Sequence, residues 1–206
     1  MCLFSILFVI LQCMKKIFAM TLGALQLVCC APKQTDQAEW HSVDPKDFTT
    51  QPVDLFDNRW MALTVGNQTS ANSMTISWGS LGVLWNKPIV IVYVSEDRFT
   101  KHLMDGNKYF TVTGFPQSEE CRAALGYLGS ASGRNEDKMA GSGLTVKYTE
   151  LGNPYFDEGN IAIECKKIYS DAFKMDLLPA EEREGRYSRM GIHTFYIGEI
   201  VNIWEK

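Results

Sequence analysis

Residues 89–95, with the sequence IVIVYVS, form a run in which nearly every side chain is apolar and most are β-branched. A strand with one solvated face alternates apolar and polar residues, so an unbroken apolar run predicts a strand that is buried on both faces. β-branched and aromatic residues also fit a pleated sheet better than a helix. The chain is therefore expected to contain a sheet with a covered core strand.

Further strand patterns surround this run. Residues 59–65 and 73–78 are rich in β-branched and aromatic residues and flank the turn-forming sequence GNQTSAN, which predicts two neighbouring strands. Glycine-rich residues 79–88 are expected to be a loop. Strands are also predicted in the following segments: 108–115, 144–151, 160–170 and 193–204.

Only a few short helices are expected. Acidic residues after Ser95 indicate a helix start, and Gly106 ends that helix. Ser118 is expected to cap a second helix, and a third covers residues 137–140 after a glycine- and serine-rich loop. A long sheet pattern with short added helices predicts a mainly β fold of the α+β kind, closed or nearly closed into a barrel.

The beginning of the chain has the pattern of an export signal. Met14 is followed by Lys15, Lys16 and the apolar run IFAMTLGALQLV, as in a secretory signal peptide. We therefore assign residues 1–30 to a leader and expect translation to start at Met14. The alternative is one membrane-spanning helix that joins this run to the apolar residues before Met14, although the lysine pair interrupts it.

The leader ends in Leu27-Val28-Cys29-Cys30, which resembles a bacterial lipobox, in which a cysteine after an apolar tripeptide is lipidated. We expect Cys30 to carry the lipid, with Cys29 as the alternative. Residues 31–54 are polar with three prolines and are expected to link the lipid to a domain at residues 55–206. The chain is thus expected to be an exported bacterial lipoprotein, anchored on the periplasmic or cell-surface side of a membrane.

Composition and missing motifs narrow the function. Twenty Lys and Arg against 24 Asp and Glu give a net charge of −4, which argues against a nucleic-acid-coating surface. The sequence lacks the G-x-G-x-x-G, P-loop and G-x-S-x-G motifs. The three histidines are scattered and Cys121 and Cys165 lack zinc spacing, so no metal site is expected. A cofactor that brings its own chemistry is the favoured source of any activity.

One ordered set of motifs is specific. Residues 72–78 read NSMTISW and are followed by a glycine loop and WNKP, which is similar to the signature of the flavin reductase-like, FMN-binding split-barrel family. The resemblance spans about residues 58–203 and is greatest to the flavoredoxin branch. Its other elements, in family order, are Arg98-Phe99-Thr100, Tyr109-Phe110-Thr111, Ala124-Leu125-Gly126-Tyr127, Ser132-Gly133-Arg134 with Asp137-Lys138, Glu164-Cys165-Lys166 and Tyr196-Ile197-Gly198-Glu199.

This resemblance implies a six-stranded, Greek-key-like split β-barrel that binds FMN. FMN carries a phosphate, a polyol chain and a planar ring system, and therefore needs cations and hydroxyls at one end and apolar contact at the other. Phosphate is expected near a strand-to-helix junction and the following glycine-rich loop, although Glu96 and Asp97 would repel it if they faced it. The residues expected there are Arg98, Thr100, Ser132, Arg134 and Lys138.

The remaining cofactor contacts are expected on residues 75–86 and near the last strand. Thr75 and Ser77 share one face of a strand and can offer hydroxyls to the polyol or phosphate, with Trp78 beside them. The family implies that the backbone amides of Leu84, Trp85 and Asn86 meet the edge of the ring system. His193 is a possible catalytic residue, because the family often places a histidine near the flavin at this point.

Each of these residues also has a structural interpretation. Hydroxyls at Thr75 and Ser77 can belong to the exposed face of a strand, and Arg98 and Lys138 can be surface charges. The two tryptophans fit a core or a dimer interface, and a lone histidine is as often structural as catalytic. Only their occurrence together in family order favours the cofactor interpretation.

The resemblance implies a homodimeric flavoprotein that passes two electrons to a small acceptor or a redox partner. The electron donor would be NAD(P)H, as in an NAD(P)H:flavin reductase, or a redox protein, as in flavoredoxin. Because nicotinamide donors are cytoplasmic, export makes the second donor as plausible as the first. The alternatives are a non-enzymatic flavin-binding protein, a surface scaffold without cofactor, and a haem-binding split-barrel relative.

Overall fold

The computed structural model describes residues 38–206, which form one compact unit. The leader, Met14, Cys29 and Cys30 lie outside the described residues, so their assignments remain predictions. No helix within residues 38–206 is both long and apolar enough to cross a membrane.

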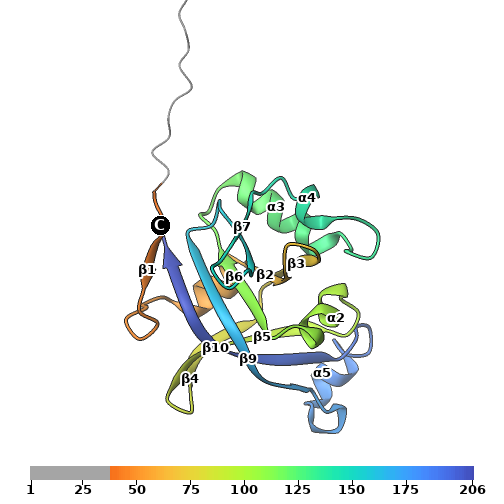
Figure 1. Ribbon diagram of the computed structural model, residues 1–206. Helices are drawn as coiled ribbons and strands as arrows, with labels where there is room; N and C mark the ends of the chain where they lie inside the picture. Colours follow the sequence, from red (N-terminus) through yellow and green to blue (C-terminus); the bar gives the residue numbers. More distant parts are fainter. Residues whose placement is uncertain (1–37) are drawn as a thin grey trace, which may run out of the picture. The chain divides into compact units, whose positions relative to one another are not determined.

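One curved antiparallel sheet of eight strands dominates the fold (Figure 1). Its order is β3-β2-β6-β9-β10-β5-β4, and β1 pairs with the far end of β10. The strands of this sheet are β1 (His41–Val43), β2 (Met61–Gly66), β3 (Ala71–Ile76), β4 (Gly79–Leu84), β5 (Lys87–Ser95), β6 (Tyr109–Gly114), β9 (Ile161–Ala172) and β10 (His193–Glu205).

The sheet carries short helices and one extra hairpin. Ser118 caps α3 by accepting a hydrogen bond from the N–H of Cys121 at 3.2 Å, which confirms the predicted cap. Asp137 likewise caps α4. The other elements are η1 (Asp54–Asn58), α2 (Phe99–Gly106), α3 (Glu119–Ser130), α4 (Lys138–Gly141), η2 (Met175–Leu177), α5 (Ala180–Glu184) and the hairpin of β7 (Val146–Tyr148) and β8 (Pro154–Phe156).

Apolar residues from six strands, β2, β3, β5, β6, β9 and β10, meet in a single core enclosed by the curved sheet. A second cluster lies on the other side of β2, where Ala62 packs with Leu125 and Leu128 of α3. Because the barrel core covers one face of β2 and this second cluster covers the other, every residue of β2 is buried. The mainly antiparallel, open barrel with few helices confirms the expected fold class.

Two elements depart from the sequence expectations. Residues 79–84, expected as a loop, form β4, because Trp85 and Asn86 both adopt positive φ (52° and 59°) and close a two-residue hairpin with β5. Positive φ at both central residues is the type I′ geometry that matches strand twist. Within the expected linker, β1 adds an edge strand to β10. Six of the seven strands predicted from sequence lie in the main sheet, and these two bring its strands to eight; the seventh, at residues 144–151, is the short strand β7 of the separate hairpin.

The strand at residues 89–95 is less covered than expected. Val90, Val92 and Val94 are fully buried in the core, as predicted. Ile91 and Tyr93 point to the opposite face and are only half-buried. The outer face of β5 is thus an apolar surface with incomplete cover in a single chain.

Gly198 lets β10 lie close to its neighbours. A Cβ atom at this position would lie 2.5 Å from Cζ of Phe110 and 2.6 Å from Cβ of Cys165. The residue adjoins an irregularity in the pairing of β10 with β9. The absence of a side chain at Gly198 is therefore a requirement of the core.

Replacing Gly198 by Ala should lower the free energy of unfolding by about 1–3 kcal/mol, because the added methyl overpacks the core. The matched change Gly126→Ala in α3, where an added Cβ meets nothing within 4 Å, should instead stabilise the protein by about 0.5–1 kcal/mol. Urea unfolding of both variants measures the difference. Equal effects of the two substitutions would contradict the packing argument.

Candidate functional site

Two adjoining cavities lie where β3 ends and where β5 leads into α2. The aromatic cavity has a volume of about 550 Å³ and the cationic cavity about 240 Å³. Both are lined by Met74, Asp97 and Arg98, so they form one continuous groove. The aromatic cavity is completed by Thr75, Ile76, Ser77, Trp78, Tyr93, Ser95, Arg186, Met190 and His193, and the cationic cavity by Asn72, Phe99, Thr100, residues 130–134 and Lys138.

The three cations of the cationic cavity are held by backbone carbonyl groups. Nη1 of Arg98 donates to the carbonyl of Gly129 at 2.8 Å. Nη1 of Arg134 donates to the carbonyl of Asp97 at 2.9 Å, and Nζ of Lys138 to that of Leu128 at 2.6 Å. Within the described part of the chain, none of the three forms a salt bridge with a carboxylate. Their positive charge is therefore available to an anion.

The pKa of Lys138 reflects the absence of a paired carboxylate. The residue is 3% exposed. Burial, followed by the nearby charge of Arg98, lowers the pKa of Lys138 to about 8. A bound anion would offset both effects.

The acidic residues beside the cavity, Glu96 and Asp97, accept hydrogen bonds from backbone N–H groups. One carboxylate oxygen of Asp97 accepts a hydrogen bond from the N–H of Gly191 at 2.7 Å. Glu96 accepts one from the N–H of Ile192 at 3.3 Å. Both carboxylates thus hold the segment before β10 in place, and the expected repulsion of an anion is reduced by these bonds.

A close approach of backbone shapes the loop that carries Ser132 and Arg134. A Cβ on Gly133 would lie 2.3 Å from Oδ1 of Asn72, so only glycine lets the loop pack here. Nδ2 of Asn72 in turn donates to the buried hydroxyl of Thr100 at 2.8 Å. Asn72 therefore connects the loop to the start of α2.

His193 and Trp78 form one wall of the aromatic cavity, with ring centroids 4.9 Å apart. His193 is 7% exposed, and its Nδ1 has no hydrogen-bond partner among residues 38–206. Burial, followed by the charges of Arg186 and Arg98, lowers the pKa of His193. The imidazole is therefore neutral at pH 7 and can bond to a ligand through an unpaired nitrogen.

The hydroxyl groups differ in availability. Oγ1 of Thr75 donates to the carbonyl of Leu125 in α3 at 2.5 Å, so towards a ligand it can only accept. Ser77 lines the aromatic cavity and is half-buried. Oγ of Ser132 accepts a hydrogen bond from the N–H of Arg134 at 3.3 Å, and its own proton is free to turn to a ligand.

The groove brings together nine of the residues predicted from sequence. These are Thr75, Ser77, Trp78, Arg98, Thr100, Ser132, Arg134, Lys138 and His193. Leu84, Trp85 and Asn86 lie at the β4–β5 hairpin tip, at the opposite end of β5 from Ser95. At about 3.3 Å per residue, the length of β5 separates this tip from the groove by about 26 Å.

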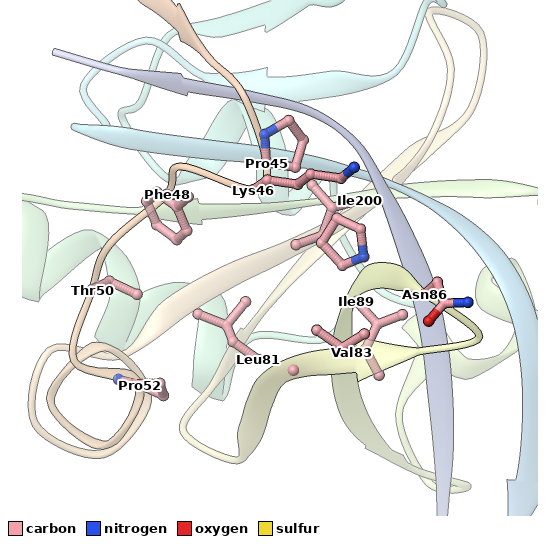
Figure 2. A pocket seen from close by; sticks show the side chains of 12 residues that line it. Pro45, Lys46, Phe48, Thr50, Pro52, Leu81, Val83, Asn86, Ile89 and Ile200 are labelled. Carbon is pink, nitrogen blue, oxygen red and sulfur yellow. The ribbon is translucent and has the colours of Figure 1, made fainter.

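Asn86 belongs to a different cavity. This cavity has a volume of about 580 Å³. Figure 2 shows Pro45, Phe48 and neighbouring residues on one side of it and Leu81 and Val83 of β4 on the other. Within one chain, the hairpin tip therefore does not reach the same ligand as Arg98 and His193.

Sequence reasoning did not assign several of the residues that line the groove, among them Asn72, Tyr93, Arg186 and Met190. Asn72 was part of the recognised motif, so its polar side chain before Met74 was an available signal. Tyr93 lay within the apolar run and gave no signal of its own. Arg186 and Met190 belong to the irregular segment between β9 and β10, where no pattern indicated a site.

Comparison with known proteins identifies the family of this chain. The family model described as the flavin reductase like domain matches residues 56–206. The chain belongs to this family. The match confirms the resemblance based on the ordered motifs, and a flavin reductase-like domain occupies nearly all of the described residues. A search of curated proteins found no significant match.

Solved structures of flavin reductase-like proteins share the fold. The flavoredoxin of Methanosarcina acetivorans is 26% identical, with a TM-score of 0.54, over 72% of this chain and 68% of that chain. The flavoredoxin of Desulfovibrio vulgaris (Miyazaki F) is 26% identical, with a TM-score of 0.55, over 71% and 69%. An FMN-binding protein from Thermus thermophilus is 22% identical, with a TM-score of 0.56, over 71% of each chain.

Proposed function

We propose that this protein binds FMN in the groove and uses it for two-electron transfer to a small acceptor or a redox partner. The observation that carries the proposal is the groove itself, with uncompensated cations at one end and aromatic side chains at the other. FMN has the same polarity, with its phosphate at one end and its ring system at the other. The similar flavoredoxins and FMN-binding protein support the same assignment.

The residues present fit this cofactor. Arg98, Arg134 and Lys138 would hold the phosphate, with Ser132 as a hydroxyl donor. Trp78, beside Ser77, would meet the ring system in the aromatic cavity. Bound FMN would supply reversible uptake of two electrons, which no side chain of the groove offers.

The protein would orient the cofactor and control protons near it. His193 lines the aromatic cavity, and its buried Nδ1 has no hydrogen-bond partner among the described residues. It could exchange a hydrogen bond or a proton with the bound molecules. We therefore keep His193 as the candidate catalytic residue.

We also propose a homodimer. The outer face of β5 and β10 exposes an apolar strip in a single chain, in which Ile91 lies opposite Ile197 and Tyr93 opposite Phe195. Tyr169 extends this strip and is 47% exposed. In such a dimer, the β4–β5 hairpin tip of one copy could contact the cofactor bound in the groove of the other copy. Trp85 and Asn86 would then have the role expected from the sequence.

Light scattering of the full chain should report a dimer, and Ile197→Lys should shift the protein towards the monomer because a charge would be buried in the interface. Gln68→Lys, in the exposed loop between β2 and β3 at the other end of the strand order, serves as the control. A wild-type chain that remains monomeric at all concentrations would exclude the dimer.

We further propose that the protein is exported and held at a membrane by a lipid on Cys30. In that location a redox protein or a membrane component would be the electron donor. Cys30→Ser should abolish incorporation of radiolabelled palmitate and release the protein from membranes, whereas Cys121→Ser, within the domain, should do neither. Unchanged labelling of Cys30→Ser would direct attention to Cys29 or to a spanning helix.

Purified protein should show flavin absorbance after addition of FMN. Arg98→Gln should weaken FMN binding about tenfold and leave riboflavin binding nearly unchanged, because riboflavin lacks the phosphate. The exposed Lys108→Gln is the control.

FMN affinity should also fall as pH rises through about 8, since Lys138 then loses its charge, and this dependence should disappear in Lys138→Gln.

Anaerobic reduction distinguishes the candidate activities. Bleaching of the bound flavin by NADH favours an NAD(P)H:flavin reductase, and bleaching by dithionite alone favours a carrier that another protein reduces. Flavin that binds but takes up no electrons would favour a non-enzymatic flavin-binding protein. If no flavin binds at excess FMN, the cofactor assignment fails and the scaffold alternative gains support.

A further inference from the structure

Arg186 lies over Trp78 at the mouth of the aromatic cavity, apart from the cations assigned to phosphate. Its Cζ atom is 4.9 Å from the centroid of the Trp78 ring. Arg186 and Met190 line this cavity and are both exposed to solvent. They therefore border the path by which a second molecule would enter.

The guanidinium group of Arg186 is oriented by one ion pair. Its Nε donates to Glu182, one turn earlier, at 2.9 Å. Within the described part of the chain, Nη1 and Nη2 form no hydrogen bond. Glu182 and the Trp78 face thus hold a planar fork whose terminal donors are free. Such a fork matches a carboxylate, which can accept two parallel N–H bonds.

His193 provides a second, independent indication of a ligand in this cavity. Its side chain is 93% buried, and its Nδ1 lacks a partner among residues 38–206. An unpaired buried nitrogen is unfavourable unless a ligand satisfies it. Trp78 and Tyr93 add flat apolar surface on the same lining.

We propose that Arg186 selects the second substrate of the site, a small planar molecule that carries a carboxylate group. The carboxylate binds the free Nη groups, and the planar body lies in the aromatic cavity beside the flavin that the proposed function places there, next to the imidazole of His193. This inference rests on the proposed flavin function, because it names the class of molecule that would exchange electrons at this groove. Glu182 acts as a positioning residue for Arg186.

The test compares 2-naphthoate with its neutral counterpart 2-naphthamide, which differ in charge but hardly in shape. The full chain, purified in a nonionic detergent and saturated with FMN, is titrated with each compound by calorimetry. Wild-type protein should bind the carboxylate about tenfold more tightly than the amide, a moderate factor because Arg186 is partly solvated. Arg186→Gln should bind both equally, and Arg186→Lys should retain part of the preference.

Arg189→Gln is the matched control, since Arg189 is an exposed arginine of the same segment that does not line the cavity. It should keep the full preference. Equal binding of the two compounds by wild-type protein, a preference that survives in Arg186→Gln, or its loss in Arg189→Gln would overturn the proposal.

FMN binding is followed separately by the quenching of flavin fluorescence. If the chain binds no FMN, the proposed function fails, and the same titrations are made on the FMN-free chain. The preference for the carboxylate then still supports or overturns the role of Arg186.

Discussion

The pairing of β10 with three other strands is the interaction on which the rest of the structure depends. Its 13 residues form ladders with β9, β5 and β1. Gly198 lets this strand lie against Phe110 and Cys165, and irregular pairing near it bends the sheet around the core. His193 lies at one end of this strand and lines the groove, and the other end of the strand pairs with β1. The position of His193 is thus a consequence of the barrel's central ladder.

A second constraint acts through buried polar groups. Glu164 on β9 is fully buried and accepts hydrogen bonds from Thr149, Asn153 and Asn202. These bonds attach the loop between β7 and β8 to the centre of the sheet. In the same way, Glu96 and Asp97 bind the backbone before β10 and fix the segment that carries Arg186. Acidic residues in this protein therefore position loops, which leaves the nearby cations of the groove uncompensated.

Sequence patterns predicted most of the fold and most residues of the cationic cavity because the signals there are local. The cap at Ser118, the strand-to-helix junction at Arg98 and the loop at Ser132 each depend on neighbours in sequence. The hairpin at Trp85 and Asn86 was missed because two non-glycine residues adopt positive φ there. Arg186 was missed for a different reason: only the tertiary fold brings its irregular segment over Trp78. The exposure of Tyr93 likewise depends on which elements cover the outer face of the sheet, and no local sequence pattern specifies that cover.

The charges of the groove also connect its two ends. Arg98 in the cationic cavity and Arg186 above the aromatic cavity both act with burial to lower the pKa of His193. An anion bound at either arginine would offset part of this effect, so the pKa of His193 would rise towards its ordinary value as the groove fills. An NMR titration of the imidazole with and without the bound anion would register that rise. The protonation of His193 is therefore coupled to the charge at both arginines, which would link cofactor binding, substrate charge and proton supply in the proposed function.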